Sequence, residues 1–323
     1  MTSLGEFDFI AQYLAPLAAG HEGAFGLKDD AARLTCGNGL VVTTDTLVQG
    51  VHFRKSDPWD LAIRKAVRVN LSDLAAMGAA PQAIILSIVW PENSDSSAMI
   101  ALADGLAADL ANYGVPLIGG DTTRGGDRLI LTITAFGECE TPVRRSGAAT
   151  GDDVYVSGTI GDASLGLNAS RHDALSDDDK SALDQRYLLP EPRHQLAAGL
   201  ANLMSAAIDV SDGLVADAAH VADASGLALE LHLAELPLSD AAKNWVGDSE
   251  DPIDALVTLA TSGDDYELLF CAPPIHRDAI KQVAAASGVA ATRMGRCLAG
   301  HGVALLDASG KPVEITRSGF THF

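Results

Sequence analysis

Three segments of the chain place an aspartate directly after an apolar run that is typical of a β-strand. The runs lead into Asp45, Asp121 and Asp209, and each aspartate has threonine, serine or glycine neighbours. Carboxylate and hydroxyl oxygens are hard ligands of the kind Mg²⁺ prefers, and ligand sites in α/β sheets form at strand ends. The pattern predicts a metal site, although a single aspartate after a strand is more often a turn or helix-cap residue.

Further acidic residues join these three. Asp212 follows Asp209 closely, Asp29–Asp30 is a tandem acid, and Asn70 and Asp73 are three apart in a predicted helix, so they share one face. If the acids converge, several carboxylates within a few ångströms cannot all ionise without counter-cations. A divalent metal is the obvious cation, whereas separate acids would be caps, turns or a solvated helix face.

Phosphate binding is the second chemistry that the sequence suggests. Gly119 and Gly120 would let backbone N–H groups approach a phosphate. Arg144–Arg145 is the best arginine candidate, and it reads equally well as a surface basic pair. The chain has neither a G-x-x-x-x-G-K-[ST] loop nor the protein-kinase motifs. The residues alone therefore predict metal-dependent phosphate chemistry at an unusual nucleotide site.

Composition limits the class of protein. A length of 323 residues fits two domains, and the formal net charge of −21 argues against nucleic acid and anionic membranes as partners. The four cysteines lack metal-site spacing and read as thiols of a reduced compartment. No signal-peptide pattern is apparent, and no apolar run is long enough to span a bilayer. We expect a cytoplasmic protein.

Strands and helices alternate throughout, which predicts an α/β or α+β class with a domain boundary between residues 148 and 149, in a Gly/Ala/Thr-rich segment. A polar loop is expected over about 170–184 and a hairpin over 303–316. The predicted strands are 40–42, 83–90, 115–118, 128–137, 154–157, 206–208 and 266–271, and the predicted helices are 7–19, 58–77, 94–113, 192–203, 214–224 and 275–287.

A series of motifs, in a fixed order, spans nearly the whole chain. They are KDDAA (28–32), TTDTLVQGVHF (43–53), VNLSDLAAMGAAP (69–81), LIGGDTTRG (117–125), RRSGA (144–148), GDDVYVSGTIGDASLGL (151–167), IDVSDGL (208–214), SGDDYELLF (262–270) and GFTHF (319–323). With these motifs the chain resembles the thiamine-monophosphate kinase family, within the PurM-like superfamily that includes aminoimidazole ribonucleotide synthetase and selenophosphate synthetase. VNLSDLAAMGA and LIGGDTT are the most specific of the motifs that carry the resemblance.

The resemblance implies a two-domain PurM-like fold and a homodimer. An N-terminal domain over 1–148 would bind ATP and metal and would dimerise by joining sheets, and a C-terminal α/β domain would cover 149–323. It also implies direct phosphoryl transfer from ATP to thiamine monophosphate, assisted by several Mg²⁺ ions and without a phosphoenzyme. Because the acceptor is itself a phosphate, no strong general base is needed.

Site residues follow from the same resemblance, position by position. Magnesium ligands would be Asp30, Asp45, Asp73, Asp121, Asp209 and Asp212, with Asp121 and Asp212 required for turnover. Thr43, Thr44 and Ser211 would add hydroxyl or backbone contacts to metal or nucleotide, with Thr44 counted among the metal ligands, and Gly120, Asp121 and Arg145 would contact ATP. His52, Asp264 and Phe320 fall on substrate positions, with the Phe320 ring stacking on the thiamine; His52 could equally be a packed core residue.

Two positions depart from the family pattern, and two other readings compete with it. Lys28 replaces a glycine, and Asp264 replaces a glutamate that is one methylene longer. One rival is another superfamily enzyme with the same ATP site; a selenophosphate synthetase is disfavoured because the N-terminal glycine-rich region lacks a reactive cysteine. The other is a non-catalytic acidic protein that binds calcium, against which the absence of EF-hand spacing argues.

Overall fold

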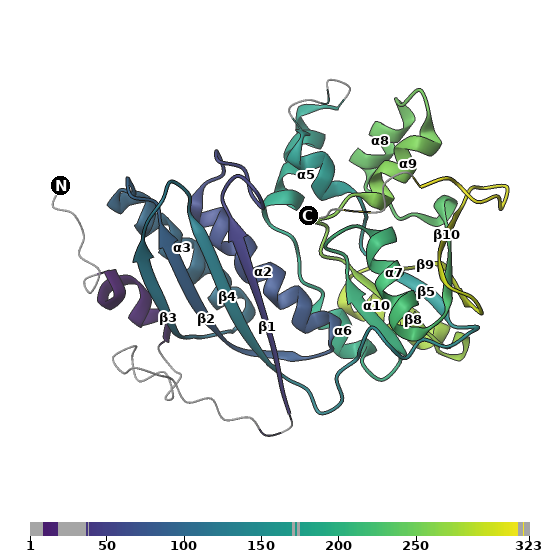
Figure 1. The fold of residues 1–323 in the computed structure, drawn as a ribbon, viewed down its shortest axis with the longest axis horizontal. Coiled ribbons are helices and arrows are strands. Elements are labelled where there is room, and N and C mark those ends of the chain that lie inside the picture. The colour runs from purple at the N-terminus through teal and green to yellow at the C-terminus, as the bar shows by residue number, and fades with distance from the viewer. Residues whose placement is uncertain are drawn as a thin grey trace. The chain divides into compact units, whose positions relative to one another are not determined.

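The computed structural model describes residues 9–18, 37, 39–169, 172, 175–315 and 319. Contacts divide the chain into two compact units, the first formed by Met1–Leu74 and Ala79–Thr141, the second by Ala75–Gly78 and Pro142–Phe323. The boundary predicted from the sequence lies at 148–149. Both units combine a sheet with helices (Figure 1), so the predicted mixed α/β class is confirmed.

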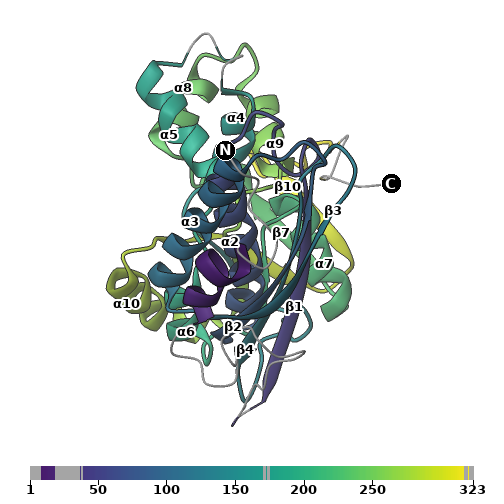
Figure 2. The same cartoon turned by 90° about the vertical axis from the view of Figure 1, so that its left-hand side faces the viewer.

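The first unit is a four-stranded sheet with helices on one face. Its strands are β1 (Leu40–Val48), β2 (Ala80–Trp90), β3 (Leu117–Arg124) and β4 (Ile130–Glu138), in the order β1-β4-β2-β3. β4 runs antiparallel to β1 and β2, and β2 runs parallel to β3. Helices α2 (Trp59–Ala76) and α3 (Ser96–Tyr113) cover one face, as Figure 2 shows edge-on.

Alternation along β4 separates the two faces of this sheet. Leu131, Ile133 and Ala135 are fully buried under the helices, while the intervening Thr132 and Thr134 are half-buried on the other side. This is the period of two that an antiparallel strand with one covered face requires. We call the side that carries Thr132 and Thr134 the open face.

Helix ends in this unit follow their capping residues. The predicted start of α3 at Ser94 is wrong by two residues, because the Asp95 side chain accepts a hydrogen bond from the backbone N–H of Ala98 and so caps the helix. Its predicted end is confirmed: Gly114 takes the left-handed conformation (φ 66°). The helix predicted over 7–19 is instead a π-helix over Ile10–Leu14 and a 3₁₀-helix over Ala15–Ala18, where Pro16 lacks the N–H that an α-helix needs.

The second unit contains a six-stranded sheet in the order β10-β7-β9-β5-β8-β6, in which only β10 and β7 are parallel. Its helices include short 3₁₀ turns over Leu233–Glu235 and Pro274–His276. The strands are β5 (Asp153–Ser157), β6 (Ala206–Asp209), β7 (Ala228–His232), β8 (Leu268–Ala272), β9 (Ala291–Leu298) and β10 (Gly302–Leu306). The helices are α4 (Asp162–Leu167), α5 (Asp177–Leu188), α6 (His194–Leu200), α7 (Leu214–Ser225), α8 (Asp240–Gly247), α9 (Pro252–Thr261) and α10 (Arg277–Ser287).

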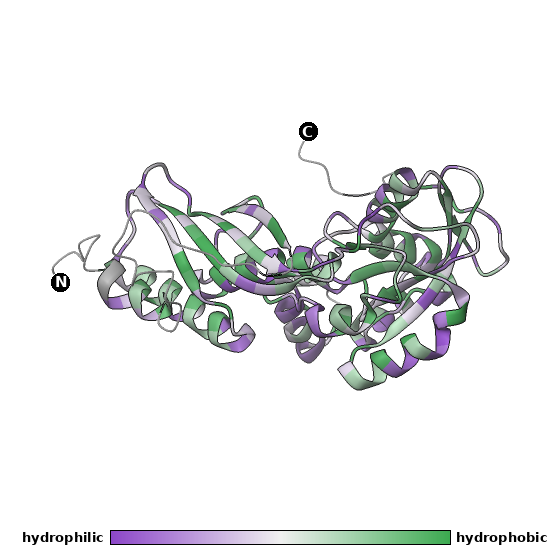
Figure 3. Cartoon of the chain, turned by 90° about the horizontal axis from the view of Figure 1, so that it is seen from below, coloured by the Kyte–Doolittle hydropathy of each residue, from purple (hydrophilic) through white to green (hydrophobic). Residues whose placement is uncertain are grey.

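Both faces of this sheet are buried, so the second unit has three layers. Val154 and Val156 of β5 pack into the core that contains α7. Tyr155, between them, faces the opposite core with α6 and α10, where its ring stacks on Phe270 at 5.1 Å between centroids. Figure 3 shows the outer helices striped green and purple, as expected when one side packs on a sheet and the other meets water.

Two of the sequence predictions for this unit are right only in part. Residues 177–184 of the polar segment expected to be a loop belong to α5, because Ser176 caps this helix by accepting from the N–H of Asp179, and the acids of the first turn favour the positive end of the helix dipole. The hairpin turn expected at 308–310 is present, but its second arm is short. Leu306 bridges Pro312 antiparallel, and the N–H groups of Asp307 and Val313 donate to the carbonyl oxygens of Lys311 and Leu305. The longer pairing of β10 is the parallel one with β7. Among the described residues, no helix has both the length and the apolar character to cross a bilayer.

Candidate metal and phosphate site

The structure corrects where the strand aspartates sit. Asp45 and Asp121 lie inside β1 and β3, and only Asp209 is the last residue of its strand. The first two strands run on because their hydroxyl-rich continuations remain paired: Asp45 lies opposite Ile133, and Asp121 opposite Ser87. Threonine is β-branched and favours strands, so a run of threonines is a poor sign that a strand has ended.

An acidic pair in the first unit forms where α2 meets β1. The Thr43 hydroxyl donates to Asp73 Oδ2 at 2.5 Å, and the backbone N–H of Asp45 donates to Asn70 Oδ1 at 3.1 Å. Asn70 in turn donates to the Ala66 carbonyl oxygen of its own helix. The predicted common face of Asn70 and Asp73 is thus confirmed, and it brings Asp73 beside Asp45.

The electrostatics of this pair fit a divalent cation. Burial is the main cause that raises the pKa of Asp45 to about 6, and the charge of Asp73 and a hydrogen bond between the two carboxyls add to the effect. Two carboxylates, with a threonine hydroxyl beside them, are the hard oxygen ligands that suit Mg²⁺. Among the described residues of this unit, Asp45, Asp73 and Thr43 therefore form a set that could hold a magnesium ion.

The Asp45 carboxyl should make metal-free stability depend on pH. Its pKa is higher in the folded chain than the model-peptide value of 3.8, so folding stability falls as pH rises from about 4 to about 6. We expect Asp45→Asn to be more stable than the wild type in EDTA at pH 7. Its free energy of unfolding in urea should be higher by about 1–2 kcal/mol after allowance for solvent screening. The gain should vanish near pH 4, and an equal gain at both pH values would contradict this.

Thr44 and Asp121 lie on the other side of this sheet. The Thr44 hydroxyl donates to the Ile133 carbonyl oxygen and accepts from Thr134 on the open face, so the hydroxyl beside the acids is that of Thr43. Asp121 shares its register row with Ser87, Thr132 and Thr46. Asp45 shares its row with Ile133, Leu86 and Gly120, which belong to the helix-covered side.

The first unit by itself therefore does not bring Asp121 to the Asp45–Asp73 pair. Three strand spacings, or roughly 14 Å, and the thickness of the sheet separate Asp121 from Asp45. Gly120 has a structural reason to be glycine, because a Cβ there would lie 2.0 Å from the Leu86 carbonyl oxygen. The metal and ATP roles predicted for Asp121 and Gly120 stay predictions.

His52 lies in the tight turn that follows β1. Its Nδ1 accepts a hydrogen bond from the backbone N–H of Val48 at 3.0 Å, and the side chain is half-buried. The His52 ring is thus part of the turn, and this hydrogen bond involves Nδ1 and not Nε2. A substrate contact by His52 is neither required nor prevented by this arrangement.

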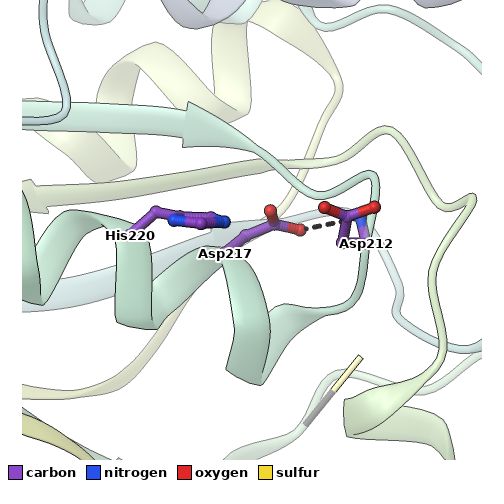
Figure 4. A group of neighbouring side chains, drawn as sticks. All are labelled: Asp212, Asp217 and His220. Carbon is purple, nitrogen blue, oxygen red and sulfur yellow. Dashed lines mark hydrogen bonds between the residues drawn. The ribbon is translucent and has the colours of Figure 1, made fainter. Parts of the chain in front are cut away.

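The second unit has its own acidic cluster in the loop between β6 and α7. Asp209 is buried at the end of β6, and Asp212 is half-buried in the loop. Asp217, in the first turn of α7, accepts three backbone hydrogen bonds from this loop at one oxygen, Oδ2. Side-chain ligand atoms of Asp212, Asp217 and His220 lie within 4.8 Å of one another, and Figure 4 shows Asp217 between the other two.

Sequence reasoning missed Asp217 and His220 in this cluster. Burial raises the pKa of Asp217 to about 7, with a further contribution from the charge of Asp212, while the three N–H donors act in the opposite direction. The available signal was an acid in the first turn of the helix that follows the motif IDVSDGL, a position where a side chain can accept from free backbone N–H groups.

A second loop lies against this one and carries Asp264. The backbone N–H of Asp264 donates to the Ser211 carbonyl oxygen, and that of Tyr266 donates to the Val210 carbonyl oxygen, both at 2.8 Å. Glycine is required at 263, because a Cβ there would lie 2.2 Å from the Ser211 oxygen. The structure therefore brings Asp264, predicted to bind substrate, into the neighbourhood of Ser211 and Asp212.

This second loop has a strained backbone and carries two buried acidic side chains. Asp264 (φ 77°) and Tyr266 (φ 52°) both have left-handed backbones, which cost about 1–3 kcal/mol each in residues other than glycine. Between and after them stand buried acids. Asp265 accepts from the N–H groups of Gly161 and Ala163, and burial raises its pKa well above the usual range. Glu267 accepts hydrogen bonds from Ser157, Arg186 and Arg193.

The Arg145 segment is held by the far end of α7. Ser225 Oγ accepts from the N–H groups of Gly147 and Ala148 and donates to the Arg145 carbonyl oxygen. The Arg145 side chain is exposed. A fixed backbone with an exposed guanidinium suits a phosphate contact, and it suits a surface basic residue equally well.

Asp30 and Phe320, together with Lys28, lie outside the described residues. A hollow of about 420 Å³ in the first unit is lined by Trp59, the turn Pro91–Ser94, Gly126 and Asp127. None of the predicted site residues lines it, so the acidic clusters, and not this hollow, are the candidate site.

Both units of the chain are similar to known proteins. Residues 28–139 match the family described as AIR synthase related protein, N-terminal domain, and residues 149–307 match the corresponding C-terminal domain. The thiamine-monophosphate kinase of Caulobacter vibrioides is 41% identical over 98% of this chain and 90% of its own length.

Solved structures agree. The crystal structure of thiamine-monophosphate kinase from Stenotrophomonas maltophilia superposes with a TM-score of 0.80 at 40% identity, over 88% of this chain and 90% of that one. The structure of AaThiL complexed with AMPPCP and TMP gives 0.78 at 33% identity, over 99% and 97%. With such similarity across both units, the chain belongs to the thiamine-monophosphate kinase family.

Proposed function

We propose that this protein transfers the terminal phosphoryl group of ATP to thiamine monophosphate, giving thiamine diphosphate and ADP. The observation that carries the proposal is the similarity over nearly the full chain to AaThiL, whose structure holds AMPPCP and TMP. The acidic pair Asp45–Asp73 and the Asp209–Asp212 loop supply the oxygen ligands that such a reaction needs to neutralise two anionic reactants.

In this proposal the described acids Asp45, Asp73, Asp209 and Asp212 hold magnesium, which supplies charge neutralisation when bound. In the same proposal the Arg145 guanidinium binds a phosphate oxygen. Asp264, on its strained loop, contacts the substrate. The acceptor is a phosphate that is largely ionised near neutral pH, so these residues need to orient and hold the reactants and not to remove a proton.

A direct assay tests this function. The purified protein, with ATP, Mg²⁺ and thiamine monophosphate, should give equal amounts of thiamine diphosphate and ADP on ion-exchange chromatography. Unphosphorylated thiamine in place of the monophosphate, and EDTA in place of Mg²⁺, should give no product. Product from thiamine alone, or ADP without thiamine diphosphate, would refute the proposal.

We further propose that two copies of the chain pair through the open face of the four-stranded sheet. Leu40 and Val42 are 48% and 51% exposed there, on the strand that forms one edge of the sheet. Exposed apolar side chains on the open face of an edge strand favour association with a second copy. Sedimentation equilibrium should give twice the chain mass of 33.4 kDa, and Val42→Asp should shift it to the monomer. A wild-type monomer at 50 µM would contradict the pairing.

A further inference from the structure

Asp217 has an unusual set of contacts for an acid in a helix. Its side chain is almost fully buried in the first turn of α7, with 2% of its surface exposed. One oxygen, Oδ2, accepts from three consecutive backbone N–H groups: Ser211 at 3.0 Å, Asp212 at 3.1 Å and Gly213 at 3.1 Å. The three N–H bonds offset part of the cost of burying the carboxylate.

The loop that these bonds hold is constrained on its other side as well. Gly213 has φ 129° and ψ 146°, a backbone open to glycine, and a Cβ there would lie 2.8 Å from the Thr261 carbonyl oxygen. The Gly263 backbone is packed against the Ser211 carbonyl oxygen. Backbone hydrogen bonds from Asp264 and Tyr266 hold this loop against its neighbour, and Asp217 fixes the direction of its three N–H groups from the α7 side.

The consequence falls on Asp212, the middle residue of the three. Because the N–H groups before, at and after this position all point to Oδ2 of Asp217, both peptide planes that flank Asp212 have a fixed rotation. The starting direction of the Asp212 side chain is then set by the backbone and does not depend on a bound ion. Figure 4 shows the hydrogen bond between the Asp212 N–H and Asp217, which lies between Asp212 and His220.

A role for Asp217 as a metal ligand is the competing reading, because ligand atoms of Asp212, Asp217 and His220 lie within 4.8 Å of each other. The hydrogen bonds argue against it. Three donors already occupy Oδ2, so only Oδ1 is left to meet an ion, and most of the carboxylate is used to bind the backbone.

We propose that Asp217 is a positioning residue, which orients the Ser211–Gly213 loop and so presents the Asp212 carboxylate to the metal–nucleotide complex. This inference rests on the proposed kinase function and on the proposed metal role of Asp212. It adds a residue that touches neither reactant and acts through the backbone.

Two substitutions separate positioning from ligation. An asparagine at 217 keeps an oxygen that can accept the same three N–H bonds, whereas alanine removes the acceptor. We expect Asp217→Asn to keep kcat within about threefold of wild type, and Asp217→Ala to lose about 10–100-fold, as is typical when an outer support of a metal ligand is removed. The KM for thiamine monophosphate should change by a smaller factor than kcat in Asp217→Ala, since neither substitution removes a proposed substrate contact. The matched control is Asp223→Asn, an exposed acid on the same helix.

A measurement without turnover accompanies the kinetics. Mn²⁺ binding in the presence of a non-hydrolysable ATP analogue, followed by the EPR signal of free Mn²⁺, should weaken about tenfold in Asp217→Ala and hardly at all in Asp217→Asn. All assays are run well below the melting temperature of each variant, so a general loss of stability does not imitate the result.

Each outcome decides the matter. Equal losses of metal binding and kcat in Asp217→Asn and Asp217→Ala would make Asp217 a ligand and overturn the positioning role. Wild-type values in both would overturn it as well. If the wild type forms no thiamine diphosphate, the proposed function fails, and the Mn²⁺ measurement still reports whether Asp217 supports metal binding.

Discussion

Asp212→Asn is expected to lower kcat for thiamine diphosphate formation by about a thousandfold while the protein stays folded. The substitution keeps size and shape but removes a negative charge proposed to bind magnesium. Loss of a charge-stabilising contact to a phosphoryl transition state is worth several kcal/mol, and about 4 kcal/mol corresponds to three decades in rate. The loop geometry should survive, because its backbone is held by Asp217 and by the Gly263 contact.

Steady-state kinetics and a thermal melt check this expectation. Asp223→Asn on α7 carries the same chemical change at an exposed position and should behave as wild type. A kcat within tenfold of wild type in Asp212→Asn, at saturating Mg²⁺, would remove Asp212 from the metal site. A melting temperature many degrees lower would instead mean that the carboxylate supports the fold.

Asp121→Asn, made in parallel, asks a different question. The sequence pairs Asp121 with Asp212 as a residue required for turnover, yet Asp121 lies on the open face of its sheet, in the row of Thr132 and Thr46. A comparable loss of kcat in Asp121→Asn would show that the open face takes part in the reaction. Wild-type activity would restrict the site to the remaining acids.

Much of the fold could be predicted from the sequence because its strands are dense in apolar residues. The runs that became β2 and β4 have inward faces of Ile, Leu and Ala with little interruption, and such runs are recognisable by period and composition. Strands β7 and β9 were missed because they alternate apolar residues with Glu, His and Arg over a few residues. Helix α5 was missed because its stability comes from its cap and acidic first turn and not from an apolar stripe.

The site was less predictable, because its decisive contacts join residues far apart in the chain. Whether Thr43 or Thr44 faces the acids depends on the strand register, and a shift of one residue exchanges the two faces. The motifs contain Asp264 and Asp212, but the hydrogen bonds that bring their loops together involve backbone atoms, which carry no sequence signal. Arg186 and Arg193 could not be paired with Glu267 from spacing alone, since 81 and 74 residues separate them.

The second prediction concerns Glu267 and the two arginines, Arg186 and Arg193, that bind it. Glu267 has no exposed surface and accepts from both guanidinium groups and from the Ser157 hydroxyl, whose oxygen in turn accepts from the N–H of Leu268. Glu267→Ala is expected to lower the free energy of unfolding in urea by about 3–5 kcal/mol, because two largely buried guanidinium groups lose their nearest carboxylate and keep only the longer contacts to Asp162 and Glu191. Glu191→Ala is the matched control: Glu191 also pairs with Arg193 but is largely exposed, and it should cost less than about 1 kcal/mol.

The same substitution should also affect the substrate. Glu267 follows the two left-handed residues Asp264 and Tyr266, whose strained backbone persists only while its surroundings hold it. Without the carboxylate the loop can relax, and Asp264 then leaves the position that it has beside Ser211. We therefore expect the KM for thiamine monophosphate to rise more than the KM for ATP, measured at a temperature where the variant is folded. Equal rises in both, or a stability loss below about 1 kcal/mol, would mean that the buried charges do not hold the Asp264 loop in place.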